Sequence, residues 1–318
     1  MLALAWALLV GAAAPPIFTF RTDEFWLNLH QFLYVLGRAE ARAFDANREA
    51  VVHAPEEAER GLQQASEAER VLWRSAVSWY ANGLSRQDAV FDAPLPQLAR
   101  ALAAGGDAPE APRLSPADAE VRAVLQQVAP IYRKLWWPEH RDANRRWVQG
   151  MDSLVAHYGD SVLAFLTRVY QMDWPEDGYP IHVAGYANWA GAFSTTGNLL
   201  IVSSLDSLSR RLYGLETVFH EAMHQWDPGI DALLDEEAGK LGRRVPPSLS
   251  HAMIFFTAGE AIRRVAPEHV PYADAFGVWQ RRWQPMREAL MDIWKPYLDG
   301  AGTRDEAIVK LLERLTEP

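Results

Sequence analysis

The stretch His220-Glu-Ala-Met-His224, within residues 215–227, places two histidines four residues apart with a glutamate directly after the first. An α-helix turns once in 3.6 residues, so both imidazoles lie on one face, within reach of a single metal ion. Glu221 lies at the edge of that face, where its carboxylate could take a proton from a metal-bound water. The stretch therefore predicts a helical metal site that activates water.

The alternative is a helix whose histidines are satisfied by hydrogen bonds in the core or to solvent. The context favours the metal site, because the motif falls on an amphipathic helix that directly follows a predicted strand. The chain contains no cysteine, which excludes disulfides, a thiol nucleophile and cysteine-type zinc sites. Any metal must therefore be held by histidine, aspartate or glutamate.

A catalytic zinc needs a third protein ligand and an open position for water. Glu260 is the first candidate, because its carboxylate interrupts the strongly apolar helix predicted around it, where an unpaired charge is costly. The alternative for Glu260 is a salt bridge to Arg263 or Arg264, one turn further on. His251 precedes Glu260 by nine residues, which is half a turn out of phase, so we expect His251 to face away from the ligand.

Two histidines on one helix and a glutamate on a later helix resemble the gluzincin branch of the zincin metallopeptidases, over residues 179–265. The resemblance implies His220, His224 and Glu260 as ligands of one catalytic zinc, and Glu221 as the general base. Those enzymes often carry an aspartate four residues after the glutamate ligand. This chain has Arg264 there, so the role of orienting the first histidine is unfilled or taken by another group.

The family commonly adds a tyrosine, histidine or arginine that supports the developing oxyanion. Tyr272 is the first choice for that role, with His251 and Arg263 as alternatives, while ordinary packing with a surface hydroxyl is the competing explanation for Tyr272. The Tyr-Ala-Asn-Trp-Ala-Gly-Ala segment at residues 186–192, after a helical first half, is also similar to uncharacterised bacterial proteins.

The pattern of the chain predicts an α+β protein that is predominantly helical. Residues 15–175 show helical periodicity alone, including a helix pair over residues 142–170. Residues 179–186 and 198–204 are short, aliphatic and bordered by glycine or asparagine, which predicts two strands. We expect a zincin-like catalytic region at 176–318, with the strand at 198–204 as the sheet edge to which a peptide could add.

Charge and the N-terminus restrict partners and location. Lysine and arginine number 31 against 41 aspartates and glutamates, and the net charge of −10 disfavours nucleic acid and anionic lipid as partners. Residues 1–14 form an uncharged apolar run that is too short to span a bilayer, so no stable membrane insertion is expected. The run predicts a signal peptide and a periplasmic or secreted protein, or a cytoplasmic one if it is not a signal peptide.

The favoured function is a zinc metallopeptidase acting on peptides or proteins. One alternative is a zinc hydrolase with the same site and a non-peptide substrate. The other is a helical binding or scaffold protein whose zinc site is structural or degenerate, although a purely structural site has no use for Glu221.

Overall fold

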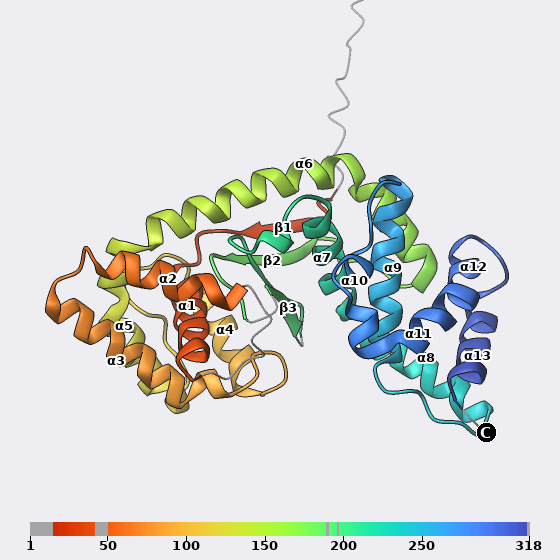
Figure 1. The fold of residues 1–318 in the computed structure, drawn as a ribbon, viewed down its shortest axis with the longest axis horizontal. Coiled ribbons are helices and arrows are strands. Elements are labelled where there is room, and N and C mark those ends of the chain that lie inside the picture. The colour runs from red at the N-terminus through yellow and green to blue at the C-terminus, as the bar shows by residue number, and fades with distance from the viewer. Residues whose placement is uncertain (1–14, 42–49, 189–190, 196, 317–318) are drawn as a thin grey trace, which may run out of the picture.

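A four-stranded sheet lies at the centre of the molecule, with helices on either side of it (Figure 1). The computed structural model describes residues 15–41, 50–188, 191–195 and 197–316. These residues form a mostly helical α+β protein, which confirms the fold class expected from the sequence. The predicted signal segment at 1–14 lies outside the described residues. Within the described ranges, no helix combines the length and apolar character needed to cross a bilayer.

The sheet has the order β1-β2-β4-β3 and is parallel except at one edge. β1 (Phe18–Arg21) pairs in parallel with β2 (Tyr179–Ala184), and β2 pairs in parallel with β4 (Leu199–Ser203). β3 (Ala192–Thr195) is antiparallel to β4, with Ser194 opposite Leu200. The predicted strands β2 and β4 are present, while β1 and β3 are additions that the sequence pattern did not indicate.

The expectation that residues 198–204 form the sheet edge is wrong. β4 lies between β2 and β3, and β3 is the edge strand on that side. All five residues of β4 are buried. A continuous apolar run of this kind is typical of an interior strand that is covered on both faces.

The sheet separates two hydrophobic cores because successive side chains of a strand point to opposite faces. Leu199 and Ile201 of β4 belong to the N-terminal core, and Leu200 and Val202 belong to the C-terminal core. The helices of the N-terminal core are α1 (Phe25–Glu40), α2 (Ala50–Leu62), α3 (Glu67–Asn82), α4 (Pro94–Ala104) and α5 (Ala119–Leu135). Those of the C-terminal core include α7 (Arg211–Met223), α8 (Asp227–Lys240), α9 (Leu249–Val265), α10 (Tyr272–Ala275), α11 (Gln284–Ala289), α12 (Lys295–Leu298) and α13 (Arg304–Leu315).

One long helix, α6 (Trp137–Tyr170), runs along both halves of the molecule (Figure 1). The predicted helix pair over 142–170 is therefore a single helix of 34 residues. Its first turn packs in the N-terminal core through Trp137, and its later turns pack in the C-terminal core from Trp147 onwards. Near its start, the buried Asn144 side chain donates to the Asn28 side chain of α1 at 3.1 Å and to the Val183 carbonyl of β2 at 3.0 Å. These hydrogen bonds fix α1 and α6 against the sheet.

The buried imidazole of His30 should make the protein sensitive to acid. Burial lowers the pKa of His30 to about 4, and its Nδ1 lies 3.0 Å from the Tyr80 hydroxyl. The unfolded chain therefore binds a proton at His30 more readily than the folded chain does. The contribution of the neutral His30 imidazole to the free energy of unfolding is complete above pH 6.5 and is lost as the pH falls towards 4. We expect a loss of about 3 kcal/mol across this window from His30. Urea unfolding of wild type and His30→Asn between pH 7 and 4 measures it.

The His30→Asn variant is expected to show a flatter dependence of unfolding free energy on pH, even if it is less stable at pH 7. His157→Gln is the matched control, because that imidazole is exposed on α6 and its loss should leave the profile unchanged. Equal pH slopes for wild type and His30→Asn would contradict the assignment.

Candidate metal centre

Three histidines converge where α7, the turn that follows it and α9 meet. His220 lies on α7, His224 begins the short turn His224–Trp226, and His251 lies in the first turns of α9. One ring nitrogen from each can be chosen so that all three lie within 4.8 Å of one another. The structure therefore brings together the two histidines of the sequence motif and adds a third from a separate helix.

The structure does not bring Glu260, the predicted third ligand, to the two histidines of the motif. In the group of described residues whose donor atoms converge, His251 stands where Glu260 was expected. The Glu260 carboxylate instead lies 2.6 Å from Arg263 and 3.5 Å from the Lys295 ammonium on α12. The alternative considered from the sequence, an ion pair with Arg263, is the one observed. His251 and Glu260 do lie half a turn apart in phase on α9, but His251 rather than Glu260 faces the motif.

Asp227 holds the second histidine in position. Its carboxylate accepts a hydrogen bond of 2.8 Å from His224 Nδ1, which leaves Nε2 as the nitrogen available to a metal. Burial works to lower the pKa of His224, but the hydrogen bond to Asp227 and the charge of Glu221 outweigh it and raise this pKa. Arg264, at the position of the family's aspartate, pairs with Asp299. Asp227, directly after the motif, therefore orients the second histidine, whereas no carboxylate among the described residues bonds Nδ1 of the first.

The environment of His220 favours the neutral imidazole that metals bind. Burial, together with the neighbouring His224 and His251 rings, holds the pKa of His220 well below its usual value. Its ring packs on Phe255 with centroids 4.0 Å apart. Among the described residues, its Nδ1 is buried without a hydrogen-bond partner. A buried polar atom without a partner is uncommon and is consistent with a site built for an additional group.

Glu221 lies beside the three histidines and is anchored by the sheet. Its Oε1 is 4.0 Å from His220 Nε2, and its Oε2 accepts a hydrogen bond of 2.7 Å from the Ser194 hydroxyl on β3. Burial raises the pKa of Glu221, while His224 and the hydrogen bonds from Ser194 oppose the rise. A raised pKa suits a general base, which works best when its pKa approaches the operating pH.

Ser194 was missed by sequence reasoning. It lies 27 residues before Glu221, inside the segment read as a loop between two strands. A lone serine carries no spacing signal, so only the pairing of β3 with β4 reveals that it faces the motif helix.

Aromatic side chains form the wall beyond the histidines. The His251 ring stacks near Phe255 at 5.4 Å and meets the Trp283 indole at 5.2 Å. Tyr272 is one ring further out, because its centroid is 6.3 Å from that of Phe255. Its predicted role as oxyanion support stays a prediction.

A buried carboxylate fixes the chain around Tyr272. The Tyr272 backbone N–H donates to both oxygens of Glu216 at 3.0 Å, and His269 Nε2 lies 2.6 Å from the same carboxylate. Glu216 is one turn before His220 on α7. A side chain at Gly259 on α9 would collide with Pro271 at 2.5 Å, so this glycine is required for the close packing of α9 against the Tyr272 segment.

The donor set fits a divalent transition metal. Three imidazoles are a known ligand set of catalytic zinc, leaving a further position for water. Imidazole also suits copper, iron and nickel, whereas calcium and magnesium prefer oxygen ligands. The Glu221 carboxylate lies beside this set, with its Oε1 4.0 Å from His220 Nε2.

Comparison with known proteins returned no relative. No protein-family model matches the chain, and no curated protein matches it. No solved structure matches the fold. The geometry of the histidine cluster is therefore the basis on which a function can be assigned.

Proposed function

We propose that the protein is a zinc-dependent hydrolase, and that its substrates are peptides or proteins. The convergence of His220, His224 and His251, with the Glu221 carboxylate beside them, carries the proposal. A zinc ion held by the three imidazoles would supply Lewis acidity, which lowers the pKa of a water and polarises a carbonyl. The motif helix resembles that of zincins, but His251 as the third ligand, in place of a glutamate, departs from the gluzincin pattern.

The roles of the protein's own groups follow from their contacts. Glu221 would accept a proton from the attacking water and deliver it to the leaving amine. Ser194 holds one oxygen of that carboxylate at 2.7 Å, which orients the base. Asp227 fixes the ring of His224. A site that served only to stabilise the fold would need neither a buried base nor a hydroxyl to orient it, which favours hydrolysis over a structural zinc site.

The edge strand β3 supports a peptide rather than a non-peptide substrate. β3 is the edge of the sheet next to the motif helix, and its Ser194 contacts the proposed base directly. An extended peptide can add to such an edge through main-chain hydrogen bonds, which would bring its carbonyl groups past Glu221. Export from the cytoplasm, predicted from residues 1–14, remains part of this proposal.

Zinc dependence and substrate class can be tested together. The purified protein is expected to contain about one zinc per chain and to cleave members of a broad peptide library. Removing the metal with a chelator should abolish cleavage, and added zinc should restore it. Zinc without cleavage of any amide bond would favour a non-peptide substrate or a scaffold role. Absence of zinc from a folded protein that also fails to take it up would refute the proposal.

A further inference from the structure

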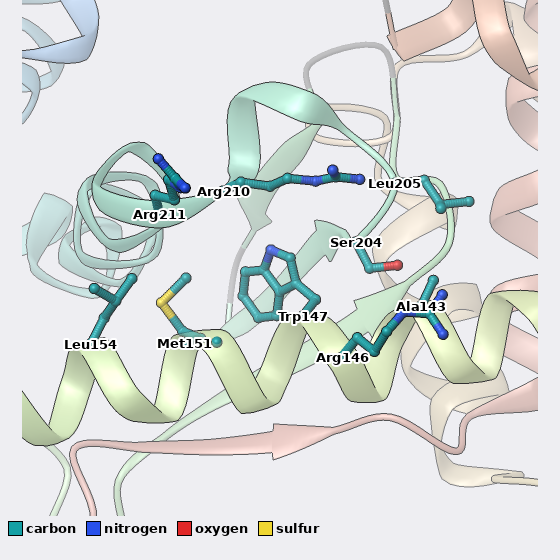
Figure 2. Close-up of a pocket in the computed structure, with 10 residues that line it drawn as sticks. Ala143, Arg146, Trp147, Met151, Leu154, Ser204, Leu205, Arg210 and Arg211 are labelled. Carbon is teal, nitrogen blue, oxygen red and sulfur yellow. The ribbon is translucent and has the colours of Figure 1, made fainter.

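A cavity of about 430 Å³ lies apart from the histidine cluster, beneath the segment that joins β4 to α7 (Figure 2). One wall is the first half of α6, and the other is the chain from the end of β4 to the start of α7. A volume of this order matches small-molecule sites, which span roughly 300–1,000 Å³. The lining residues include Ala143, Arg146, Trp147, Met151, Leu154, Ser204, Arg210 and Arg211.

Three arginines line this cavity. Among the residues that the structure describes, Arg146, Arg210 and Arg211 take part in no salt bridge, whereas the adjacent Arg145 pairs with Asp23 at 2.8 Å. All three side chains are exposed, and Figure 2 shows Arg210 reaching towards Leu205, Arg146 lying beside Ala143 and Arg211 over the start of α7. Their positive charges contrast with the net charge of −10 of the whole chain. Arginine presents a planar fork of donors that suits carboxylate and phosphate groups.

The floor of the cavity is apolar. Trp147 stands up from α6, and Arg210 reaches across from the segment before α7 (Figure 2). The indole is held by a hydrogen bond of 2.5 Å from its Nε1 to the Ser209 carbonyl. Met151 and Leu154 continue the apolar surface one and two turns further along α6. An inorganic anion alone would leave this surface uncovered.

The start of α7 adds to the positive potential. The helix begins at Arg211, and its N-cap residue Arg210 provides no side-chain hydrogen bond to the first turn. The first N–H groups of a helix have no partner within the helix, and together with the positive end of the helix dipole they favour an anion at this end.

We propose that this cavity binds a small organic anion, in which a carboxylate or phosphate group is attached to a flat apolar body. The guanidinium groups would hold the anionic group, and the apolar body would lie on Trp147. The site is independent of the metal centre, because none of the three clustered histidines lines the cavity.

Calorimetric titration of the full-length protein with phenyl phosphate, benzoate, inorganic phosphate and phenol tests the proposal. We expect one site that binds phenyl phosphate or benzoate at least about tenfold more tightly than inorganic phosphate, and no binding of phenol. The two aromatic anions together show whether the site prefers a phosphate or a carboxylate. Equal binding of inorganic phosphate would reveal a simple anion site and would overturn the proposed apolar contact.

Matched variants locate the site. The double variant Arg146→Ala with Arg210→Ala is expected to weaken binding of the aromatic anion by about tenfold or more. Arg211→Gly removes the third guanidinium where φ is +53°, a conformation that glycine adopts without strain, so folding should be preserved. Arg74→Ala is the control, because it removes an exposed arginine on α3 with the same change in charge as Arg211→Gly. Equal weakening by Arg74→Ala, or undiminished binding in the cavity variants, would refute the site.

Discussion

Replacement of His251 by alanine is expected to remove zinc from the purified protein, whereas Glu260→Gln is expected to leave the zinc content unchanged. The imidazole of His251 converges with those of His220 and His224, while the Glu260 carboxylate is engaged by Arg263 and Lys295. Loss of a group that merely supports a ligand weakens metal binding by about 10–100-fold, so loss of a ligand should exceed about a hundredfold. Competition against a chromophoric chelator measures both affinities.

The two variants also differ in what they do to the fold. Glu260→Gln removes a charge from a buried ion-pair network and should lower the unfolding free energy, by about 1–3 kcal/mol, without affecting zinc. His251→Ala should lower the zinc affinity more than it lowers the unfolding free energy. His157→Ala, at an exposed histidine, is the control and should change neither. A chain that keeps its zinc without His251 and loses it without Glu260 would restore the ligand set inferred from the sequence.

The exchange of Glu260 for His251 shows where sequence reasoning stops. The helical phase was sufficient to place the two residues on opposite faces of α9. The choice of face was not accessible, because most residues of α9 are buried and no solvent-facing stripe orients the helix. The apolar pattern shows that both faces are covered, but it does not show which neighbour covers each face.

The sheet illustrates a second limit. β2 and β4 have the aliphatic composition of strands and were predicted. β1 has only four residues and pairs with β2 from about 160 positions away in the chain, so local composition carries no sign of its partner. β3 is equally short, and its position at the edge depends on pairing with β4. The contact between Ser194 and Glu221 therefore required the structure, although the motif residues themselves did not.

The largest functional effect is expected from Glu221→Gln, which should abolish detectable hydrolysis while leaving zinc bound. The amide has nearly the shape of the carboxylate and can still accept the Ser194 hydrogen bond, so the histidine cluster should stay intact. It cannot accept a proton from water, and loss of a general base costs roughly 10²–10⁴-fold in rate. Because the base acts in the chemical step, kcat should fall while KM changes little.

Two further variants separate the chemistry of Glu221 from a general loss of negative charge. Glu236→Gln removes an exposed carboxylate on α8 and should leave kcat unchanged. Ser194→Ala retains the base but frees one of its oxygens, so its kcat should lie between those of wild type and Glu221→Gln. Measuring the zinc content of all three variants shows whether a lower kcat results from loss of zinc or from loss of the base. Full activity in a zinc-loaded Glu221→Gln protein would show that another group accepts the proton. In that case Glu221 and its hydrogen bond from Ser194 would have a structural role beside a zinc that remains catalytic.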